Sequence, residues 1–373
     1  MENNNSVCYV ARINEIKPIP GADNIEQGVI GGWNCIFKKG EYKVNDLVAI
    51  ATTDAVIPQG LSDAMNVTNY LRKGQRVRTV KLRGVYSECL VIPNQFLPVG
   101  YNPEGKDLMD SLSIFKYEPP VVQVQLASGR KIRYHQNPNF HVYYKFPNLK
   151  NVAGMFNEND AVEITRKLHG TNARYGIVKK TRLSILDRIK KFLRIGKHIE
   201  YEFVYGSHNV EKGSDSQGFY DTDVWKTIAE KHNIREKLWN LFDLSKDLYD
   251  IQEGIVIYGE IYGPGIQKNY DYGLTELKYA GFDVTINGQY CEGARSFAIH
   301  NIMGLDYVPE LYIGLWSQEI QDKYTFNNFI EGTQIPHEGI VIKSIDGNRQ
   351  KVAKVINPDY LIYGEKHDVG DSH

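Results

Sequence analysis

Short apolar segments separated by turn-forming residues fill the chain from residue 6 to about residue 110. These segments, bounded by Gly, Pro, Asn and Asp, have the length of strands rather than of helices. We expect five strands, at about 6–14, 29–37, 46–52, 76–82 and 89–92. So many short strands in so short a region predict a small all-β barrel, in preference to an open sheet or a sandwich.

A second domain is expected because 373 residues exceed the usual size of one compact core. Five strands are also the strand count of the OB fold, a barrel that often binds oligonucleotides, and we assign an OB-fold domain to residues 1–114. The second domain, residues 115–373, begins with prolines among scattered aromatic residues, at Pro119, Pro120, Pro138 and Pro147. This composition is typical of a linker that packs across a domain junction.

The second domain mixes strands with helices, which predicts an α+β fold. Its expected strands lie at about 160–166, 172–178, 199–206, 254–262, 278–286, 339–344 and 350–356. Its expected helices lie near 222–249, 294–304 and 317–330.

Composition excludes several classes of protein. The chain is 42% hydrophobic and 24% charged, as in ordinary globular proteins, and its net charge of −1 means that any affinity for nucleic acid must come from local clusters of cations. No run of about 18 apolar residues occurs, and the first residues lack an apolar leader. The four cysteines form no C-x-x-C pair, which argues against zinc and disulfides. We expect a soluble, intracellular monomer, of the cytoplasm or nucleus, with a viral source left open.

Two segments are strongly basic. The first holds Arg72, Lys73, Arg76, Arg78, Lys81 and Arg83 without an acidic residue, and it fits either a charged edge strand or a contact with phosphates. The second, residues 179–197, has the apolar spacing of an amphipathic helix and includes Lys190, Lys191 and Arg194. That helix fits a solvated cover for the sheet, a phosphate contact or a membrane surface.

The pattern richest in chemistry surrounds Lys167, which ends one expected strand, while Gly170 opens the next. A K-x-x-G sequence alone fits many surface turns. Five further segments follow in order, each a strand with a polar residue at one end: Phe203 to Asn209, Ile255 to Gly263, Ala280 to Val284, His337 to Lys343, and Lys351 to Val355.

This ordered set resembles the motifs of the covalent nucleotidyltransferase superfamily, which includes ATP- and NAD-dependent ligases and mRNA capping enzymes. The Lys-Leu-His-Gly-Thr-Asn sequence at 167–172 resembles RNA ligases related to T4 RNA ligase 2. Residues 8–58 and 76–93 resemble the amino-terminal OB domain of the Naegleria/Deinococcus type of RNA ligase. The resemblance implies an ATP-grasp-like α+β nucleotidyltransferase domain after the barrel.

The resemblance also implies the chemistry. Lys167 would take AMP from ATP and pass it to an RNA 5′-phosphate, and a 3′-hydroxyl would then displace the AMP. The expected cofactors are ATP and Mg²⁺ or Mn²⁺. The expected substrate is RNA with a 5′-phosphate and a 3′-hydroxyl, in the form of a nicked duplex, in RNA repair. A lysine that attacks phosphorus must lose its proton, and neighbouring cations, desolvation and a metal ion favour that loss.

Residue roles follow from the same resemblance. Glu260 and Glu338 would hold the metal or the ribose hydroxyls, and Phe282 would stack on adenine. Lys343 and Lys354 would contact the α-phosphate and act in catalysis alongside Lys167. Further nucleotide contacts would come from Gly170, Asn172, His208 and Asn209. His169 stands where many relatives have Asp, and we leave open whether it shapes the turn or organises metal-bound water.

One position departs from the family pattern, because Val352 stands where the first of two lysines is expected and Lys351 precedes it. The alternatives are a DNA ligase, a capping guanylyltransferase, or a silent nucleic-acid-binding protein. In both enzyme alternatives an OB domain usually follows the transferase domain, and a silent protein is expected to lack Lys167 or the carboxylates. With a ligase, the expected backbone contacts are Arg72, Arg76, Arg78, Lys81, Arg83, Lys190, Lys191 and Arg194.

Overall fold

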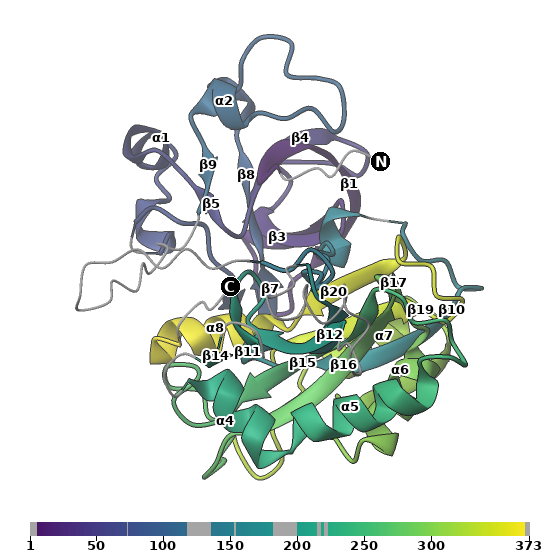
Figure 1. The fold of residues 1–373 in the computed structure, drawn as a ribbon. Helices are drawn as coiled ribbons and strands as arrows, with labels where there is room; N and C mark the ends of the chain where they lie inside the picture. The colour runs from purple at the N-terminus through teal and green to yellow at the C-terminus, as the bar shows by residue number, and fades with distance from the viewer. Residues whose placement is uncertain are drawn as a thin grey trace, which may run out of the picture.

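The computed structural model has two lobes, a barrel formed by the amino-terminal part of the chain and a larger α/β body formed by the rest (Figure 1). It describes residues 6–72, 74–117, 136–152, 154–181, 200–214, 218–219 and 223–369. Among the helices that it describes, none is long and apolar enough to span a membrane.

Five antiparallel strands in the order β3-β2-β1-β4-β8 form the barrel. Their bounds are β1 Cys8–Pro18, β2 Ile25–Ile30, β3 Trp33–Lys38, β4 Leu47–Thr52 and β8 Cys89–Ile92. The amide of Glu88, just before β8, donates to the carbonyl of Asn34 on β3 at 2.7 Å. This bond joins β8 and β3, the two edge strands of the sheet, so that the sheet nearly closes into a barrel. The predicted OB-fold barrel is therefore confirmed.

Two expected strands of the barrel differ from the structure. The segment 29–37 contains a turn at Gly31 and Gly32, whose φ values of 55° and 93° suit glycine and separate β2 from β3. The segment 76–82 is a strand only at β6 (Val80–Leu82), which forms a hairpin with β7 (Val85–Ser87). The smaller elements are β5 Ala55–Val56, α1 Gln59–Ala64, η1 Thr68–Tyr70, η2 Asn94–Phe96, α2 Met109–Leu112 and β9 Phe115–Lys116.

Two antiparallel sheets form the second lobe. The small sheet has the order β18-β10-β19-β20, and the large sheet has the order β14-β13-β12-β11-β15-β16-β17. The small sheet's strands are β10 Ala161–Lys167, β18 Glu310–Leu315, β19 Gly339–Ser344 and β20 Val352–Ile356. The large sheet's strands are β11 Thr171–Lys179, β12 Tyr201–Gly206, β13 Glu211–Ser214, β14 Gly218–Phe219, β15 Gly254–Tyr262, β16 Lys278–Ile286 and β17 Gln289–Tyr290.

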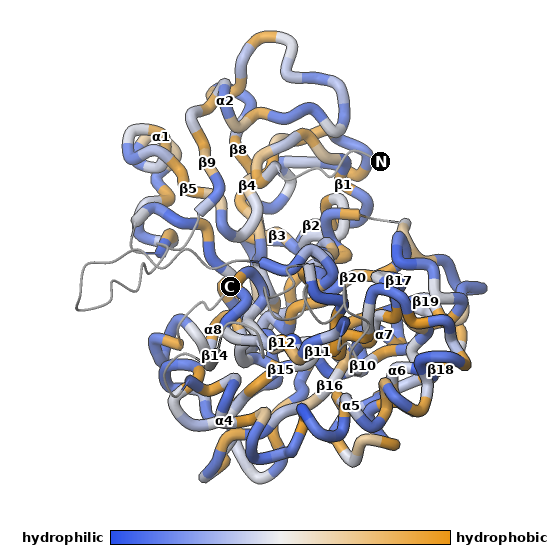
Figure 2. Tube along the Cα trace, in the orientation of Figure 1, coloured by the Kyte–Doolittle hydropathy of each residue, from blue (hydrophilic) through white to orange (hydrophobic). Residues whose placement is uncertain are grey.

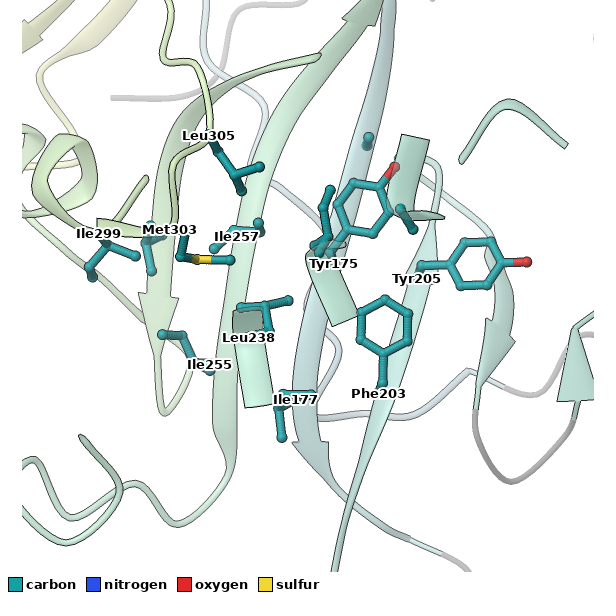
Figure 3. Packing of buried hydrophobic residues seen from close by; sticks show 14 of the residues in the cluster. Tyr175, Ile177, Phe203, Tyr205, Leu238, Ile255, Ile257, Ile299, Met303 and Leu305 are labelled. Atoms are coloured by element: carbon teal, nitrogen blue, oxygen red, sulfur yellow. The ribbon is translucent and has the colours of Figure 1, made fainter. Parts of the chain in front are cut away.

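Helices pack around the two sheets. Their bounds are η3 Leu149–Asn151, α4 Val224–Lys231, α5 Ile234–Ser245, α6 Gly293–Ile302, α7 Gln318–Thr325 and α8 Pro358–His367. Helices α4, α5 and α6 lie on the outer face of the large sheet, and α7 lies on that of the small sheet. Leu238 of α5 and Ile299 of α6, with Met303 just after it, pack on Ile177, Ile255 and Ile257 of the large sheet (Figure 3). Figure 2 shows hydrophobic and hydrophilic residues interleaved along α5, as expected for a helix with one buried face.

Parts of this lobe differ from the expected elements or lie outside the residues that the structure describes. The expected helix 222–249 is two helices, because Asn233 adopts a left-handed conformation with φ of 50° between α4 and α5. Strand β18 and helix α8 were missed. The expected basic helix at 179–197 falls almost wholly on residues 182–199, outside the described residues, while β11 extends to Lys179.

Residues 136–152 connect the two lobes along the large sheet. Phe140 and Tyr143 are buried against Val256 and Tyr258 of β15. Farther along, Lys150 forms an ion pair with Glu88 of the barrel. This stretch therefore packs on the second lobe and reaches back to the first.

Candidate active site

The inner faces of the two sheets face each other across a region that we call the cleft, where Nζ of Lys343 on β19 bonds to the carbonyl of Phe282 on β16. Side chains alternate between the faces of a strand, and Ile340 and Ile342 of β19 lie in the outer core of the small sheet, so Val341 faces inward. On the large sheet, Ile257 and Ile261 of β15 lie in the outer core, so Tyr258 and Glu260 face inward. Polar side chains on these two inner faces meet in the cleft.

Lys167 lies at the end of β10 beside the start of β19, because it pairs with Gly339. Its Nζ is 2.6 Å from Oε1 of Glu338, the residue just before Gly339. The Lys167 side chain is 24% exposed and the Glu338 side chain 10%, so the amine can be reached from the cleft while its partner is held. The pair forms because β10 ends at Lys167 beside the residue at which β19 begins.

Glu260 joins this pair from the large sheet. Glu260 pairs with Asn172 of β11, and burial raises the pKa of the Glu260 carboxyl to about 8, against the opposing effect of Lys167. Gly170 permits the close approach of β11 and β15, because an added Cβ at this position would lie 2.2 Å from the carbonyl oxygen of Ile261. Gly170, Asn172 and Glu260 thus form one wall beside Lys167.

Lys354 faces the cleft from β20, since it pairs with Val341. Burial lowers the pKa of Lys354, and the charge of Lys167 lowers it further. Lys354 therefore lies close enough to Lys167 to feel its charge. Lys351, in contrast, pairs with Asp160 at 2.9 Å and does not join this group.

His169 lies beside the carboxylate of Glu338. Its ring meets those of Tyr270 and Tyr360 edge-on, with centroids 5.1 and 5.2 Å apart, and its backbone N–H donates to the hydroxyl of Tyr272. Nδ1 of His169 is 3.9 Å from Oε2 of Glu338, whereas Lys167 contacts the other oxygen of that carboxylate. The histidine is thus held by aromatic residues next to Glu338.

The donor set suits a hard divalent cation that keeps part of its water shell. Among the described residues no group of three or more His, Cys, Asp and Glu is arranged as a complete metal cage. Mg²⁺ commonly binds through one or two carboxylates together with substrate phosphates. Oε2 of Glu338 is buried and makes no hydrogen bond to any part of the chain that the structure describes. Glu260 and Glu338 therefore fit such an ion.

Phe282 lies across the cleft on β16. Its ring packs edge-on against Tyr143, with centroids 4.9 Å apart, and the side chain is only partly buried. Lys343 lies near Phe282, and its Nζ donates to the Phe282 carbonyl at 2.8 Å.

The structure does not bring Lys343 to the Lys167 group. Lys343 pairs with Glu163 of β10, four residues from Lys167, which is about 13 Å along a strand. Lys343 contacts Asp283, at 3.3 Å, instead of the carboxylates near Lys167.

His208 and Asn209 lie in the loop after β12. Gly206, the last residue of β12, pairs with Arg174 of β11, so the loop lies beside the Asn172 end of that strand. Nε of Arg174 donates to the carbonyl of Ser207 at 2.8 Å. Burial lowers the pKa of His208, and Arg174 lowers it further, so both effects favour a neutral imidazole.

The first basic segment lies at the junction of the lobes. Arg78 pairs with Glu365 of α8 at 2.7 Å, and Lys81 lies 3.4 Å from Asp359 of the same helix. Within the barrel, Arg76 pairs with Asp54 and stacks on the ring of Tyr117. Arg83 is exposed at the tip of the β6–β7 hairpin, and Arg72 is half-buried. Lys190, Lys191 and Arg194 lie outside the described residues.

Several residues of the cleft were not singled out from the sequence. Asp283, Tyr143 and Arg349 form one buried group behind Phe282, and Arg174 holds the loop of His208. Asp283 follows Phe282 in a motif, which was a usable signal. No sequence signal connects Tyr143 or Arg349 to it, because they come from a linker and a turn.

Comparisons with known proteins agree on the fold. An OB-fold domain family matches residues 7–94. Three solved structures of Naegleria gruberi RNA ligase resemble this one: variants with ATP and Mn and with AMP and Mn, each with a TM-score of 0.69, and the enzyme with pyrophosphate, at 0.68. Each is 22% identical and covers 97% of this chain and 99% of its own. No curated protein sequence matches the chain.

An OB-fold barrel joined to a two-sheet domain is the fold that this chain shares with these RNA ligase structures. The RNA ligase family matches residues 160–356, which is more than half of the 373 residues. The chain therefore belongs to the RNA ligase family.

Proposed function

We propose that this protein is an ATP-dependent RNA ligase that joins a 5′-phosphate to a 3′-hydroxyl through AMP bound to Lys167. The observation that carries the proposal is the placement of the Lys167 amine, partly exposed in the cleft and 2.6 Å from Glu338. The solved Naegleria gruberi enzyme is described with ATP and Mn and with AMP and Mn, which supports the same nucleotide here.

In the first step Nζ of Lys167 attacks the α-phosphorus of ATP. A bond forms between nitrogen and phosphorus, the bond to the bridging oxygen breaks, and pyrophosphate leaves. The attacking amine must be neutral, because the lone pair of its nitrogen forms the new bond. Lys354 then offsets the negative charge that develops on the phosphate oxygens.

Glu260 and Glu338 would hold a divalent cation, Mg²⁺ or Mn²⁺, or its water ligands. Such a cation, when bound, neutralises charge on the phosphates. Glu338 also orients the Lys167 amine in the free enzyme. His169 packs beside the second oxygen of Glu338, so we propose that it positions this carboxylate and does not bind the metal itself.

The remaining steps transfer AMP. An oxygen of the RNA 5′-phosphate attacks the phosphorus on Lys167, which releases the amine and leaves an AMP-capped end. The RNA 3′-hydroxyl then attacks the capped 5′-phosphate, and AMP departs as the phosphodiester forms. Phe282 offers its ring to adenine, while Gly170, Asn172, His208 and Asn209 line the nucleotide or the 5′-phosphate.

We propose that the barrel binds the RNA backbone. We propose a domain boundary near residue 115, so that residues 1–114 hold the backbone and residues 115–373 carry the chemistry. The packing of residues 137–146 on the large sheet supports this boundary, although β9 (Phe115–Lys116) still pairs with β5 (Ala55–Val56) of the first lobe. The cations of residues 72–83 lie at the junction, where an RNA between the lobes would pass.

A sealing assay tests this function. A nicked RNA duplex with a 5′-phosphate and a 3′-hydroxyl, incubated with ATP and magnesium, is expected to be joined by the wild type and not by Lys167→Ala. The same duplex with a 5′-hydroxyl at the nick should stay open. A DNA duplex and a single-stranded RNA in parallel reactions identify the preferred substrate. Sealing by Lys167→Ala, or sealing of DNA alone, would contradict the proposal.

A further inference from the structure

Strand β16 has a β-bulge at Phe282. Tyr258 of β15 pairs with Asp283, and Gly259 pairs with Gly281, so Phe282 has no partner in that ladder. A bulge redirects the side chain of its extra residue and leaves its backbone groups outside the regular bonding. The carbonyl of a bulge residue inside a protein needs other donors.

Two side chains supply these donors. Nζ of Lys343 donates to the carbonyl oxygen of Phe282 at 2.8 Å, and the hydroxyl of Tyr307 donates to it at 2.9 Å. Lys343 belongs to β19 of the small sheet, whereas Phe282 belongs to the large sheet. The bond from Lys343 therefore joins the two sheets at the bulge.

The carboxylate of Asp283, fully buried beside the bulge, completes the junction. It accepts from two nitrogens of Arg349, at 2.7 and 3.1 Å, and lies 3.3 Å from Nζ of Lys343. The hydroxyls of Tyr143 and Ser296 add bonds of 3.0 and 3.2 Å. Arg349 lies in the turn between β19 and β20, so it too links the small sheet to β16.

Lys343 is poorly placed for the phosphate. AMP on Lys167 would hold its phosphorus at the Gly339 end of β19, and Lys343 is about 13 Å farther along that strand. Its Nζ is already used by two acceptors that belong to β16. The base end of a nucleotide, beside Phe282, is the part that Lys343 can influence.

The geometry points to Lys343 and Arg349 as positioning residues for adenine: through the Phe282 carbonyl and the Asp283 carboxylate they fix the Phe282 ring against the small sheet, without contacting the phosphates. This inference rests on the proposed function. It deepens that function by assigning recognition of the base to a junction of the two sheets.

Two variants test the inference without leaving a buried charge unpaired. Lys343→Met and Arg349→Gln each leave Asp283 with one cation, so both are expected to fold. Asp283→Asn would leave two cations facing each other and is a poorer probe. Arg349→Lys keeps the charge and serves as the conservative control.

The readout is the affinity of each full-length protein for adenosine and for inorganic tripolyphosphate, measured by calorimetry. Loss of a charge-assisted bond is expected to weaken adenosine binding about tenfold in Lys343→Met and Arg349→Gln, and tripolyphosphate binding less than about twofold. Arg349→Lys should recover most adenosine affinity. Discrimination between ATP and GTP in labelling of Lys167 should fall in the same two variants.

Other outcomes overturn the inference. Weaker tripolyphosphate binding with unchanged adenosine binding would make Lys343 a phosphate contact. Equal loss of both affinities would mean a general loss of structure. A wild type that binds adenosine and forms no AMP adduct would instead refute the proposed function, so the two failures are distinguishable.

Discussion

Gly170 lies between Lys167 and β11, at a point where β15 passes very close. An alanine Cβ there would lie 2.2 Å from the carbonyl oxygen of Ile261 and 2.9 Å from Cγ of Glu260. No side chain larger than hydrogen fits without moving β15. Glycine is required here by space, since its φ is not one of the positive values.

Replacing Gly170 by alanine is expected to displace Glu260 and lower the melting temperature by roughly 2–8 °C. Formation of the AMP adduct should slow at least about tenfold, because small shifts of active-site groups reduce rates strongly. Differential scanning fluorimetry and a gel assay of the adduct measure both effects. Gly60→Ala is a matched control, because an added Cβ there meets nothing within 4 Å. A Gly170→Ala protein with wild-type rates would disprove the close approach.

Single residues of the site differ in how far the sequence could predict them. Lys167 ends β10, Glu338 directly precedes β19, and Glu260 lies two residues before the end of β15. All three fall within the ordered motifs, and their positions follow from strand register. Lys343 also follows from register, but its distance from Lys167 is visible only once the pairing with Glu163 is known. Arg349 acts through a turn, where no periodic pattern indicates what a side chain contacts.

At the scale of elements, strands β11, β12 and β13 carry buried charges at one end of the large sheet. Glu202 of β12 and Glu211 of β13 are both buried, and Asn137 of the linker bonds to both. Burial raises the pKa of Glu211 to about 7 from 4.5, and the charge of Glu202 adds to the rise. The folded protein therefore holds a proton that the unfolded chain releases between these two values.

The free energy of unfolding should accordingly fall as pH rises from about 4.5 to about 7, and then level off. Glu211→Gln stays neutral and keeps an oxygen for Asn137, so it should not show that part of the fall. Its stability relative to the wild type should rise by on the order of 1–3 kcal/mol between about pH 5 and pH 8, in urea titrations. Glu319→Gln, at an exposed site, is the control. If the difference in stability between Glu211→Gln and the wild type stays constant across this pH range, the raised pKa of Glu211 is contradicted.

Element boundaries show why periodicity alone falls short. The apolar spacing of α4 and α5 predicts one helix, because the break at Asn233 depends on a single left-handed residue. Helix α8 was missed although Asn357 caps it through the amide of Asp359 and Pro358 opens it, which is a recognisable start signal. Strand β18, with exposed Ile313 and Leu315, lies at the edge of its sheet and lacks a clear buried face.

Contacts of α8 with Arg78 and with the β6–β7 hairpin join the two lobes, in addition to the ion pair of Lys150 with Glu88. Arg78 and Lys81 face Glu365 and Asp359, and the hydroxyl of Tyr86 donates to Asp359 at 2.7 Å. Partly exposed ion pairs of this kind contribute at most about 1 kcal/mol each. We therefore predict that these cations exchange the carboxylates of α8 for phosphates when RNA binds.

Neutralising Arg76, Arg78 and Lys81 together as glutamines is expected to weaken binding to a nicked RNA duplex. The slope of log affinity against log salt should become shallower by about 0.9 for each phosphate that the protein no longer neutralises. Neutralising α8 instead, with Asp359→Asn and Glu365→Gln, should strengthen binding at low salt by releasing the cations. Fluorescence anisotropy at several salt concentrations measures both. Unchanged salt slopes in the first variant, or loss of its AMP adduct, would refute this division between barrel and cleft.

The placement of Lys167 beside Glu338 and Glu260, between the two sheets, leads to a single direct test. Wild-type protein and Lys167→Ala are incubated with magnesium and ATP labelled at the α-phosphate, without RNA, and are then separated under denaturing conditions. We predict that label stays on the wild type, with a mass increase of one AMP moiety on the peptide that contains Lys167, and that Lys167→Ala stays unlabelled. No label on the wild type, or equal label on Lys167→Ala, would contradict the account.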